Sequence, residues 1–275
     1  MVMMFKKRFF SVFFCCVFFI YGCNNDNPGL FSSTDLETRW KARNTFNFLS
    51  SDDLNISLGD TYSFIVVTDT HINDGNAWGL ERLKDVINND GSIKFAVFNG
   101  DITQNGKRGD IEKIIQIAKT LDVPCYPVLG NHDIYFDNWK IWEELIGSTC
   151  YRINGGNATL LILDSANAYY GDKQLDWLES ELNNAEGRVF IFSHVNLFVK
   201  SPSDLQHFTD IRERARFVSL LQGRCDVIFT GHSHKRLVTD LSGVKNINIE
   251  DFRRNAVYCQ VWVSKDGIQY EFKKL

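Results

Sequence analysis

The chain has 275 residues, of which 44% are hydrophobic and 23% are charged, and its formal net charge is −4 at pH 7. This length and apolar fraction are sufficient for one large domain with a substantial core. A net acidic chain is a poor candidate for binding long nucleic acids, because affinity for the phosphate backbone depends on positive charge. The charge does not exclude a small phosphorylated substrate, since bound metal ions add local positive charge.

The first 22 residues have the pattern of an export signal. Three basic residues at 6–8 precede a run from Phe9 to Tyr21 that is apolar apart from Ser11. A basic start and an apolar stretch of about a dozen residues are typical of a secretory signal, and the stretch is shorter than a membrane-spanning helix needs. Residues 20–23 resemble a bacterial lipobox, which predicts a lipid-modified Cys23 and a lipid-anchored place in the bacterial cell envelope. An ordinary secretory signal or an uncleaved N-terminal anchor is the alternative.

The remaining chain is predicted to contain a short tether and one folded domain. Removing residues 1–22 would take away three basic and no acidic residues, so the net charge would move from −4 to −7. Residues 23–60 are interpreted as a tether and an N-terminal lead-in, because residues 24–29 are rich in Asn, Asp, Pro and Gly. A single domain is predicted over residues 61–275.

Four cysteines follow Cys23, and none of them forms a Cys-x-x-Cys pair. Each lies in or beside an apolar run, which favours buried free thiols; one disulfide is the alternative in an oxidising compartment. These residues are Cys125, Cys150, Cys225 and Cys259.

From residue 62 the chain alternates between short apolar strands and amphipathic helices. Strands are predicted at 62–68, 94–98, 125–129, 159–163, 188–192 and 226–230, and helices at 80–87, 110–121, 138–146, 174–182 and 210–221. After Gly231 only antiparallel strands are expected, at 237–240, 256–264 and 267–272. This order predicts an α/β fold with two packed, mixed β-sheets flanked by helices, a four-layer αββα sandwich.

Five of the six histidines lie in short motifs with aspartate, asparagine and glycine, and one further motif supplies a carboxylate. The motifs are Asp69-Thr70-His71, Asn99-Gly100-Asp101, Gly130-Asn131-His132-Asp133, Ser193-His194 and Gly231-His232-Ser233-His234. Each follows the carboxyl end of a predicted strand, the edge at which sites of α/β sheets assemble. Because residues i and i+2 can point the same way, Asp69 with His71, and His232 with His234, are each expected to converge on one centre.

These residue types indicate a metal site. A single histidine or asparagine after a strand is more often a loop or capping group, but five such motifs together are far less plausible by chance. Imidazole, carboxylate and amide groups suit Zn, Fe or Mn. Seven such ligands, with one carboxylate shared, would bind two adjacent ions, which is an arrangement suited to phosphoryl transfer.

The ordered set DxH, GD, GNHD, H and GHxH resembles the calcineurin-like metallophosphoesterase superfamily. The resemblance covers residues from about 62 to the C-terminus and implies a pair of β-sheets flanked by helices. It also implies two divalent or trivalent metal ions (Mn, Fe or Zn) that are joined by the bridging carboxylate of Asp101. The first ion would be bound by Asp69, His71 and His234, and the second by Asn131, His194 and His232.

The resemblance also implies catalytic roles. A hydroxide between the ions would be the nucleophile, and His132, held by Asp133, would stabilise the transition state or protonate the leaving oxygen. The sequence lacks the Asp-Arg-Gly of protein phosphatases after Gly100, and its DxH motif differs from that of purple acid phosphatases. The pattern looks most like small bacterial phosphodiesterases.

We therefore predict a phosphodiesterase that acts on a small phosphorylated substrate. A phosphomonoesterase or a nuclease would share the same site, and a non-catalytic, lipid-anchored binding protein is the remaining alternative. Specificity is expected to depend on the loops at 72–79, 134–139 and 196–209. The sequence does not determine the substrate or the oligomeric state.

Overall fold

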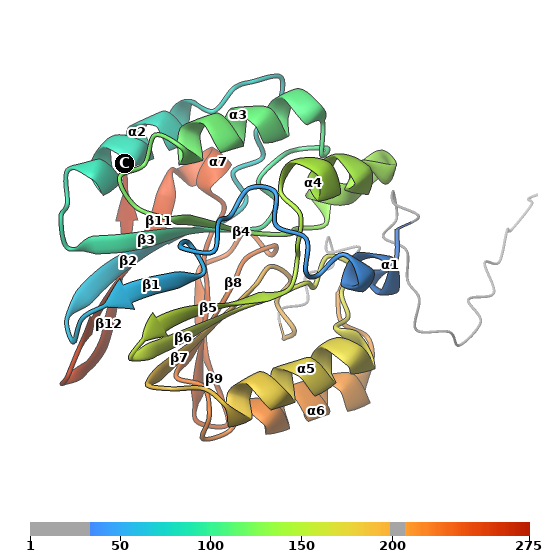
Figure 1. Ribbon diagram of the computed structural model, residues 1–275, viewed down its shortest axis with the longest axis vertical. Coiled ribbons are helices and arrows are strands. Elements are labelled where there is room, and N and C mark those ends of the chain that lie inside the picture. The colour runs from blue at the N-terminus through green and yellow to red at the C-terminus, as the bar shows by residue number, and fades with distance from the viewer. Residues whose placement is uncertain (1–33, 199–206) are drawn as a thin grey trace, which may run out of the picture.

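The computed structural model describes residues 34–198 and 207–275, in which two β-sheets pack face to face between outer helices (Figure 1). The proposed export signal, Cys23 and the Asn/Asp-rich tether lie outside the described residues. No helix within the described ranges combines the length and the apolar character that a membrane span requires.

The smaller sheet has five strands and provides three of the motif-bearing loops. Its order is β12 (Gly267–Lys274), β11 (Val257–Ser264), β2 (Tyr62–Val67), β3 (Ile93–Asn99) and β4 (Cys125–Val128). Strands β2, β3 and β4 are parallel, whereas β11 runs antiparallel to both β2 and β12.

The larger sheet has seven strands and provides the other two motif-bearing loops. Its order is β1 (Asn55–Leu58), β5 (Tyr151–Gly156), β6 (Ala158–Leu163), β7 (Arg188–Ser193), β8 (Val227–Thr230), β10 (Val244–Asn248) and β9 (Leu237–Leu241). Strands β6, β7, β8 and β10 are parallel to one another, and β5 and β9 are antiparallel to their inner neighbours.

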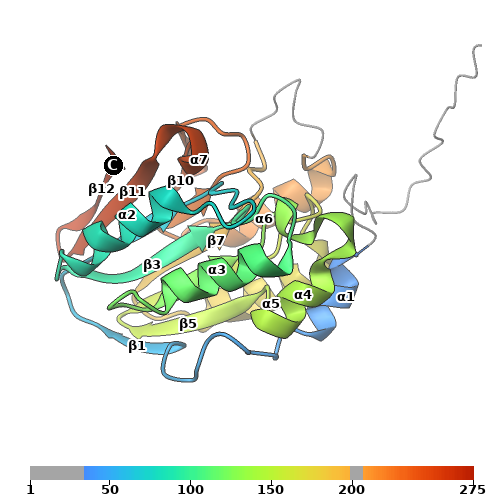
Figure 2. The same cartoon turned by 90° about the horizontal axis from the view of Figure 1, so that it is seen from above.

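The helices cover the outer faces of both sheets (Figures 1 and 2). Helices α2 (Trp78–Asn88), α3 (Arg108–Ala118), α4 (Trp139–Leu145) and α7 (Phe252–Asn255) lie on the side of the five-stranded sheet, and α5 (Gly171–Asn183) and α6 (Ile211–Leu221) cover the seven-stranded sheet. Helix α1 (Leu36–Lys41) and a 3₁₀ segment, η1 (His132–Asp137), complete the set. The expected αββα arrangement is therefore confirmed.

The alternation of side chains along the strands explains the layers. In β2, Phe64 and Val66 face the core between the sheets, whereas Ile65 and Val67 face the helices. Phe64 stacks on Phe95 of β3 with ring centroids 4.5 Å apart. Because β2 and β6 are buried on both faces, their sequences are nearly continuous apolar runs instead of alternating ones.

The predicted strands and helices are all present, with ends that differ by three residues or fewer. The structure adds α1, β1, β5, β10 and α7, which the sequence patterns did not indicate. Helix α7 contradicts the expectation that no helix follows Gly231; its four residues are too few to show a helical period. The four cysteines after Cys23 are buried free thiols, as expected.

The lead-in before residue 61 is partly built into the fold. Strand β1 pairs with β5, and α1 carries a fully buried arginine, Arg39. Its guanidinium forms a bidentate ion pair with Asp164, at 2.6 and 3.0 Å, and donates to Asn167 Oδ1 at 2.5 Å. This contact fixes the lead-in to the loop that follows β6.

We expect Arg39→Met to destabilise the protein by about 3–5 kcal/mol, because it leaves the buried carboxylate of Asp164 without its partner. Urea unfolding of the purified protein measures this loss. Lys41→Met is the matched control, because Lys41 is an exposed cation on the same helix. An equal, small effect of both substitutions would contradict a structural role for the Arg39–Asp164 pair.

Candidate metal centre

Both sheets deliver their motif loops to one place. Asp69 and His71 follow β2, Asp101 follows β3, Asn131 and His132 follow β4, His194 follows β7, and His232 and His234 follow β8. These strands are parallel within each sheet, so their carboxyl ends lie at a common edge. The site is therefore assembled from segments that are up to 165 residues apart in the sequence, from Asp69 to His234.

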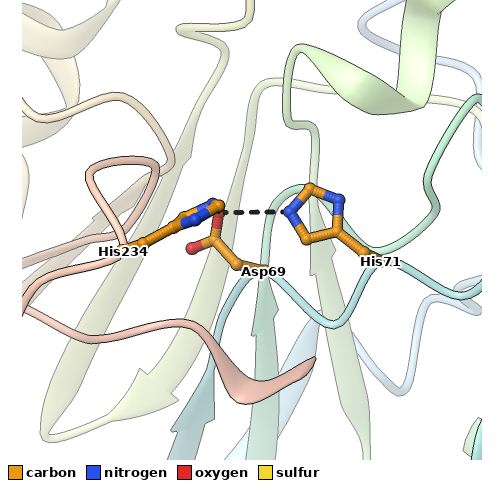
Figure 3. A group of neighbouring side chains, drawn as sticks. All are labelled: Asp69, His71 and His234. Atoms are coloured by element: carbon orange, nitrogen blue, oxygen red, sulfur yellow. Dashed lines mark ion pairs between the residues drawn. The ribbon is translucent and has the colours of Figure 1, made fainter. Parts of the chain in front are cut away.

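The carboxylate of Asp69 joins two loops with one oxygen and faces the centre with the other. Its Oδ2 accepts hydrogen bonds from Thr68 Oγ1, at 2.7 Å, and from the backbone N–H of His232, at 3.1 Å. Its Oδ1 lies 3.1 Å from His234 Nε2 and 3.8 Å from His71 Nε2. Figure 3 shows the carboxylate between these two rings.

The two carboxylate oxygens of Asp101 also have different partners. Its Oδ1 accepts a 2.8 Å hydrogen bond from the backbone N–H of His132, which connects the β3 and β4 loops. Its Oδ2 lies 3.1 Å from His194 Nε2 and 3.9 Å from the Nε2 atoms of both His71 and His132. Asp101 therefore lies where a carboxylate could be shared between neighbouring cations.

Two motif glycines allow the loops to approach this closely. A Cβ atom on Gly130 would lie 2.0 Å from the backbone nitrogen of Asp101, and one on Gly231 would lie 2.1 Å from Thr68 Oγ1. Any side chain at either position would displace one of these motif loops.

The backbone conformation of the site is also unusual. Five residues with ligand-type side chains have positive φ angles between 44° and 65°, namely Asp69, His71, Asp101, His232 and His234. This left-handed region is disfavoured for residues with a Cβ, and such strain gathers at functional sites, where the surrounding structure maintains it.

The ligand-type side chains form three overlapping groups whose atoms lie within 4.8 Å of one another: Asp69/His71/His234, His71/Asp101/His132 and Asp101/His194/His232. Asp69 and His71 share a group, as the strand-end spacing predicts. His234 lies in the group of Asp69 and His232 in a group with Asp101, and the group His71/Asp101/His132 overlaps both, so the two histidines converge on one set of neighbouring groups. Two left-handed residues in the short loop turn the rings toward different carboxylates.

Several atoms in these groups are buried without a hydrogen-bond partner, which is costly unless a cation binds them. They are Asp69 Oδ1, both ring nitrogens of His71, Asn131 Oδ1 and His194 Nε2. The amide nitrogen of Asn131 donates to Tyr135 Oη at 2.7 Å, which leaves Oδ1 free for a metal. The Nδ1 atom of His194 lies 2.9 Å from the carbonyl oxygen of Asn99, so Nε2 can be the ligand atom. The donor set fits the implied metal ions.

The pKa shifts of the buried carboxylates and histidines also indicate a site for positive charge. Burial by itself would raise the pKa values of Asp69 and Asp101, but the nearby histidines, His194 foremost, lower both. Burial opposes protonation of His194, yet the two carboxylates raise its pKa to about 9. Burial lowers the pKa of His71 to about 4, because the nearby carboxylates offset the effect of burial only in part. Two ionised carboxylates thus attract positive charge, which metal ions would supply in place of protons.

The Asp133 carboxylate has different partners from the expected one, the ring of His132. No hydrogen bond joins it to the His132 ring among the described residues; Nδ1 of that ring instead lies 2.8 Å from the carbonyl oxygen of Gln104. The Asp133 carboxylate accepts from the backbone N–H groups of Thr103 and Gly130 and from Thr103 Oγ1. Burial raises its pKa to about 6. Asp133 fastens the β3 and β4 loops together, and the expected contact with His132 is absent.

A cavity of about 430 Å³ opens beside the centre. It is lined by Thr70 and His71 of the loop after β2, by Phe252 and Arg253 of α7, and by Ile72, Asn73, Asn76, Ala77, Gly79 and Leu80. Its lining includes one of the three loops expected to govern specificity. Residues 199–206 of another lie outside the described part of the chain.

Residues 62–236 match the family model described as calcineurin-like phosphoesterase. The chain belongs to this family. The match contains all five motif loops, so the resemblance seen in the motifs is confirmed.

Two curated relatives of the chain are named as probable phosphodiesterases. The chain is 26% identical over 164 residues to a Fibrobacter succinogenes protein named as a probable cyclic nucleotide phosphodiesterase, covering 54% of this chain and 60% of the relative. It is 29% identical over 161 residues to an Arcobacter nitrofigilis protein named as a probable glycerophosphodiester phosphodiesterase, covering 51% and 56%. The aligned part thus spans a little more than half the length of these relatives.

Solved structures show the same fold at low sequence identity. A dimetal phosphatase from Danio rerio superposes with a TM-score of 0.60 at 15% identity, covering 78% of this chain and 96% of that chain. The purple acid phosphatase PPD1 from yellow lupin superposes with a TM-score of 0.63 at 12% identity, covering 80% and 52%.

Sequence patterns missed several residues around the centre. Gln104 contacts His132, Tyr135 contacts Asn131, and Arg253 lines the cavity. Gln104 lies directly after the Gly-Asp motif and could have been noticed there. Arg253 carries no local signal, because it reaches the site through long-range contacts: β11 pairs with β2, and the backbone N–H of Arg253 donates to Asp69 O.

We expect Asp101→Asn to bind fewer than about one equivalent of metal, against about two for the unchanged protein, because one carboxylate must neutralise two cations. Elemental analysis of protein loaded with Mn or Zn measures the content. Asp74→Asn is the control, since Asp74 is an exposed carboxylate near the site. Unchanged metal content in Asp101→Asn would contradict the shared-carboxylate arrangement.

Proposed function

We propose that the protein is a metal-dependent phosphoric ester hydrolase that acts on small phosphodiesters. The observation that carries this proposal is the set of three overlapping His/Asp groups, joined through His71 and Asp101, which leave buried ligand atoms without partners. The first ion would be held by Asp69, His71, Asp101 and His234, and the second by Asp101, Asn131, His194 and His232. When bound, the ions supply Lewis acidity and neutralise charge on the phosphoryl group.

His132 is proposed to act on the substrate. Its side chain is 23% exposed, more than those of His71 and His194, at 4% and 0%, and less than that of His234, at 32%. A ring that is open to solvent can reach a phosphoryl or leaving-group oxygen, and its Nε2 atom lies on the Asp101 side of the site. The position of His132 would also allow it to bind a metal ion, because it belongs to one of the three groups of ligand-type side chains.

The preference for a diester rests on the cavity and on the names of the relatives. The cavity beside His71 is lined by apolar side chains, which include Leu80 and Phe252, and by polar groups at Asn73 and Arg253. Such a space suits an ester-linked group that stays bound while the phosphate lies at the metals. Phosphomonoester and nucleic-acid hydrolysis are the other outcomes of the test below.

We expect hydrolysis of bis(p-nitrophenyl) phosphate and of a cyclic nucleotide to exceed hydrolysis of p-nitrophenyl phosphate when kcat/KM is compared. The assay uses purified full-length protein with Mn or Zn. Single-stranded DNA tests the nuclease alternative. Failure to hydrolyse any of these esters in the metal-loaded state would refute the enzymatic proposal and favour a binding protein.

We expect His132→Ala to retain both metals and to lower turnover by about 10²–10⁴-fold, the usual range for a positioned acid–base group. If the ring protonates the leaving oxygen, the loss should be smaller for p-nitrophenolate than for an alkoxide. If it stabilises phosphoryl charge, the losses should be similar. Loss of a metal equivalent would instead make His132 a ligand.

We further propose that the protein is anchored to the cell envelope through Cys23. The basic and apolar residues before Cys23 and the lipobox-like residues 20–23 support this proposal. We expect labelled fatty acid to be incorporated into the expressed protein and Cys23→Ser to abolish incorporation. The Cys259→Ser variant, which removes a buried thiol of the fold, is the control. Labelling that persists in Cys23→Ser would exclude this anchor.

A further inference from the structure

The cavity beside the proposed metal centre contains a cation and no carboxylate. Among the described residues that line it, His71 and Arg253 are the two with ionisable side chains. The chain as a whole has a formal net charge of −4. A cavity with this lining therefore differs in charge from the average of the protein, and it favours an anion over a cation.

The acidic residues next to the cavity are paired with other cations. Asp74, in the loop that lines the cavity, lies 3.0 Å from Lys107 Nζ. Asp251, which directly precedes α7, lies 3.7 Å from Arg254 Nε. Neither carboxylate forms an ion pair with Arg253, so the charge of this guanidinium is not neutralised by its neighbours.

The backbone of Arg253 is fixed beside the centre. Its N–H donates to Asp69 O at 3.2 Å, and the N–H of Phe252 donates to Thr68 O at 3.0 Å. Phe252 also packs against α2, where a Cβ on Gly79 would lie 2.6 Å from its ring. Figure 2 shows α7 beside β11 at the edge of the five-stranded sheet. Arg253 therefore has a defined position relative to Asp69 and to the cavity.

The guanidinium of Arg253 has donors to spare. Among the described residues it makes no ion pair and one hydrogen bond, from Nη1 to Gln104 Oε1 at 2.5 Å. That bond uses one of five N–H donors, and Arg253 is exposed, so water or a ligand can reach the others. The planar arrangement of these donors suits a carboxylate or a phosphate group, which accept two parallel hydrogen bonds.

We propose that Arg253 binds an anionic group of the substrate, so that the preferred substrate is a phosphodiester in which one ester-linked alcohol carries a carboxylate or a second phosphate. This inference rests on the proposed function, which places the scissile phosphate at the metals. The carbon skeleton between the two anions would pack on the apolar side chains of Leu80 and Phe252, which line the same cavity. The competing explanation is that Arg253 is an ordinary solvated cation and that the cavity accepts neutral groups equally well.

The direct test is a binding measurement that needs no hydrolysis. Calorimetry with the full-length, Zn-loaded protein compares phosphonocarboxylates that have two, three or four methylene groups with the corresponding carboxamides. Their phosphorus–carbon bond is not hydrolysed, and each carboxamide matches its carboxylate in size. We expect the carboxylate to bind roughly fivefold tighter for at least one length, and the preference to decrease as salt is raised. The bisphosphonate of that length shows whether a phosphate is preferred to a carboxylate.

Substitutions assign the preference to one side chain. We expect Arg253→Ala to remove most of it and Arg253→Lys, which keeps a cation, to retain part of it. Arg254→Ala is the matched control and should keep the full preference, because Arg254 is an exposed cation on the same helix whose near partner is Asp251.

The kinetic test uses two p-nitrophenyl phosphodiesters whose second ester group is 2-carboxyethyl or 2-carbamoylethyl. Both release p-nitrophenolate, so the leaving group is the same. We expect the ratio of their kcat/KM values to fall roughly fivefold in Arg253→Ala, mainly through KM of the carboxyethyl ester. Arg253→Glu should shift the preference toward the 2-aminoethyl ester, a reversal that a purely structural role of Arg253 would not produce.

Two results would overturn the inference. One is equal affinity for carboxylate and carboxamide at every length in the unchanged protein. The other is a carboxylate preference that persists in Arg253→Ala. If the unchanged protein hydrolyses no ester, the proposed function fails, while calorimetry still decides whether Arg253 binds an anion.

Discussion

Two buried carboxylates in the same small volume, those of Asp69 and Asp101, are the constraint around which the site is organised. Each uses one oxygen to hold a neighbouring loop through a backbone N–H, from His232 and His132 respectively. The other oxygen of each faces the histidine rings at 3.1–3.9 Å. Two such charges repel each other unless cations lie between or beside them. These two carboxylates therefore hold the loops in place, and they also require nearby positive charge to offset their own.

The packing of the two sheets makes this arrangement rigid. Asn99, at the end of β3, donates through its amide toward Ser193 O and Phe229 O of the other sheet, at 3.2 and 3.4 Å. Its own carbonyl oxygen accepts from Thr68 Oγ1 and lies 2.9 Å from His194 Nδ1. One buried asparagine therefore ties three ligand-bearing loops together. Displacement of either sheet would move ligands of both proposed ions.

The surroundings of His132 differ from those of the buried histidines. The Nδ1 atom of His194 faces a backbone carbonyl oxygen, that of Asn99, which suits a ligand of one fixed tautomer. His132 has both an acceptor and a donor from Gln104 beside the same ring nitrogen. A histidine that exchanges protons is stabilised when hydrogen-bond partners exist for both forms of its ring, whereas a metal-binding histidine keeps one form. This contrast supports the division between metal-binding and substrate-facing histidines.

The sequence by itself determined the fold class and the identity of the motif residues. Apolar runs such as Tyr62–Val67 and the helical spacing of Ile111, Ile114 and Ile115 are local signals of burial, so they reveal strands and helices directly. Motifs after strand ends predict a shared site because parallel strands end at one edge. The short α7, the edge strand β1 and the interior strand β10 lacked such signals.

Only the tertiary structure decided which groups support the motif residues. It gave Asp133 a role between loops, and it brought Gln104 to His132 and Arg253 to Gln104. Arg253 is 121 residues from His132 in the chain. Their association depends on long-range contacts that no local pattern encodes, among them the pairing of β11 with β2 and the hydrogen bond from the backbone N–H of Arg253 to Asp69 O. Residue types are specified locally, whereas hydrogen-bond partners across loops are specified by the packing of distant elements.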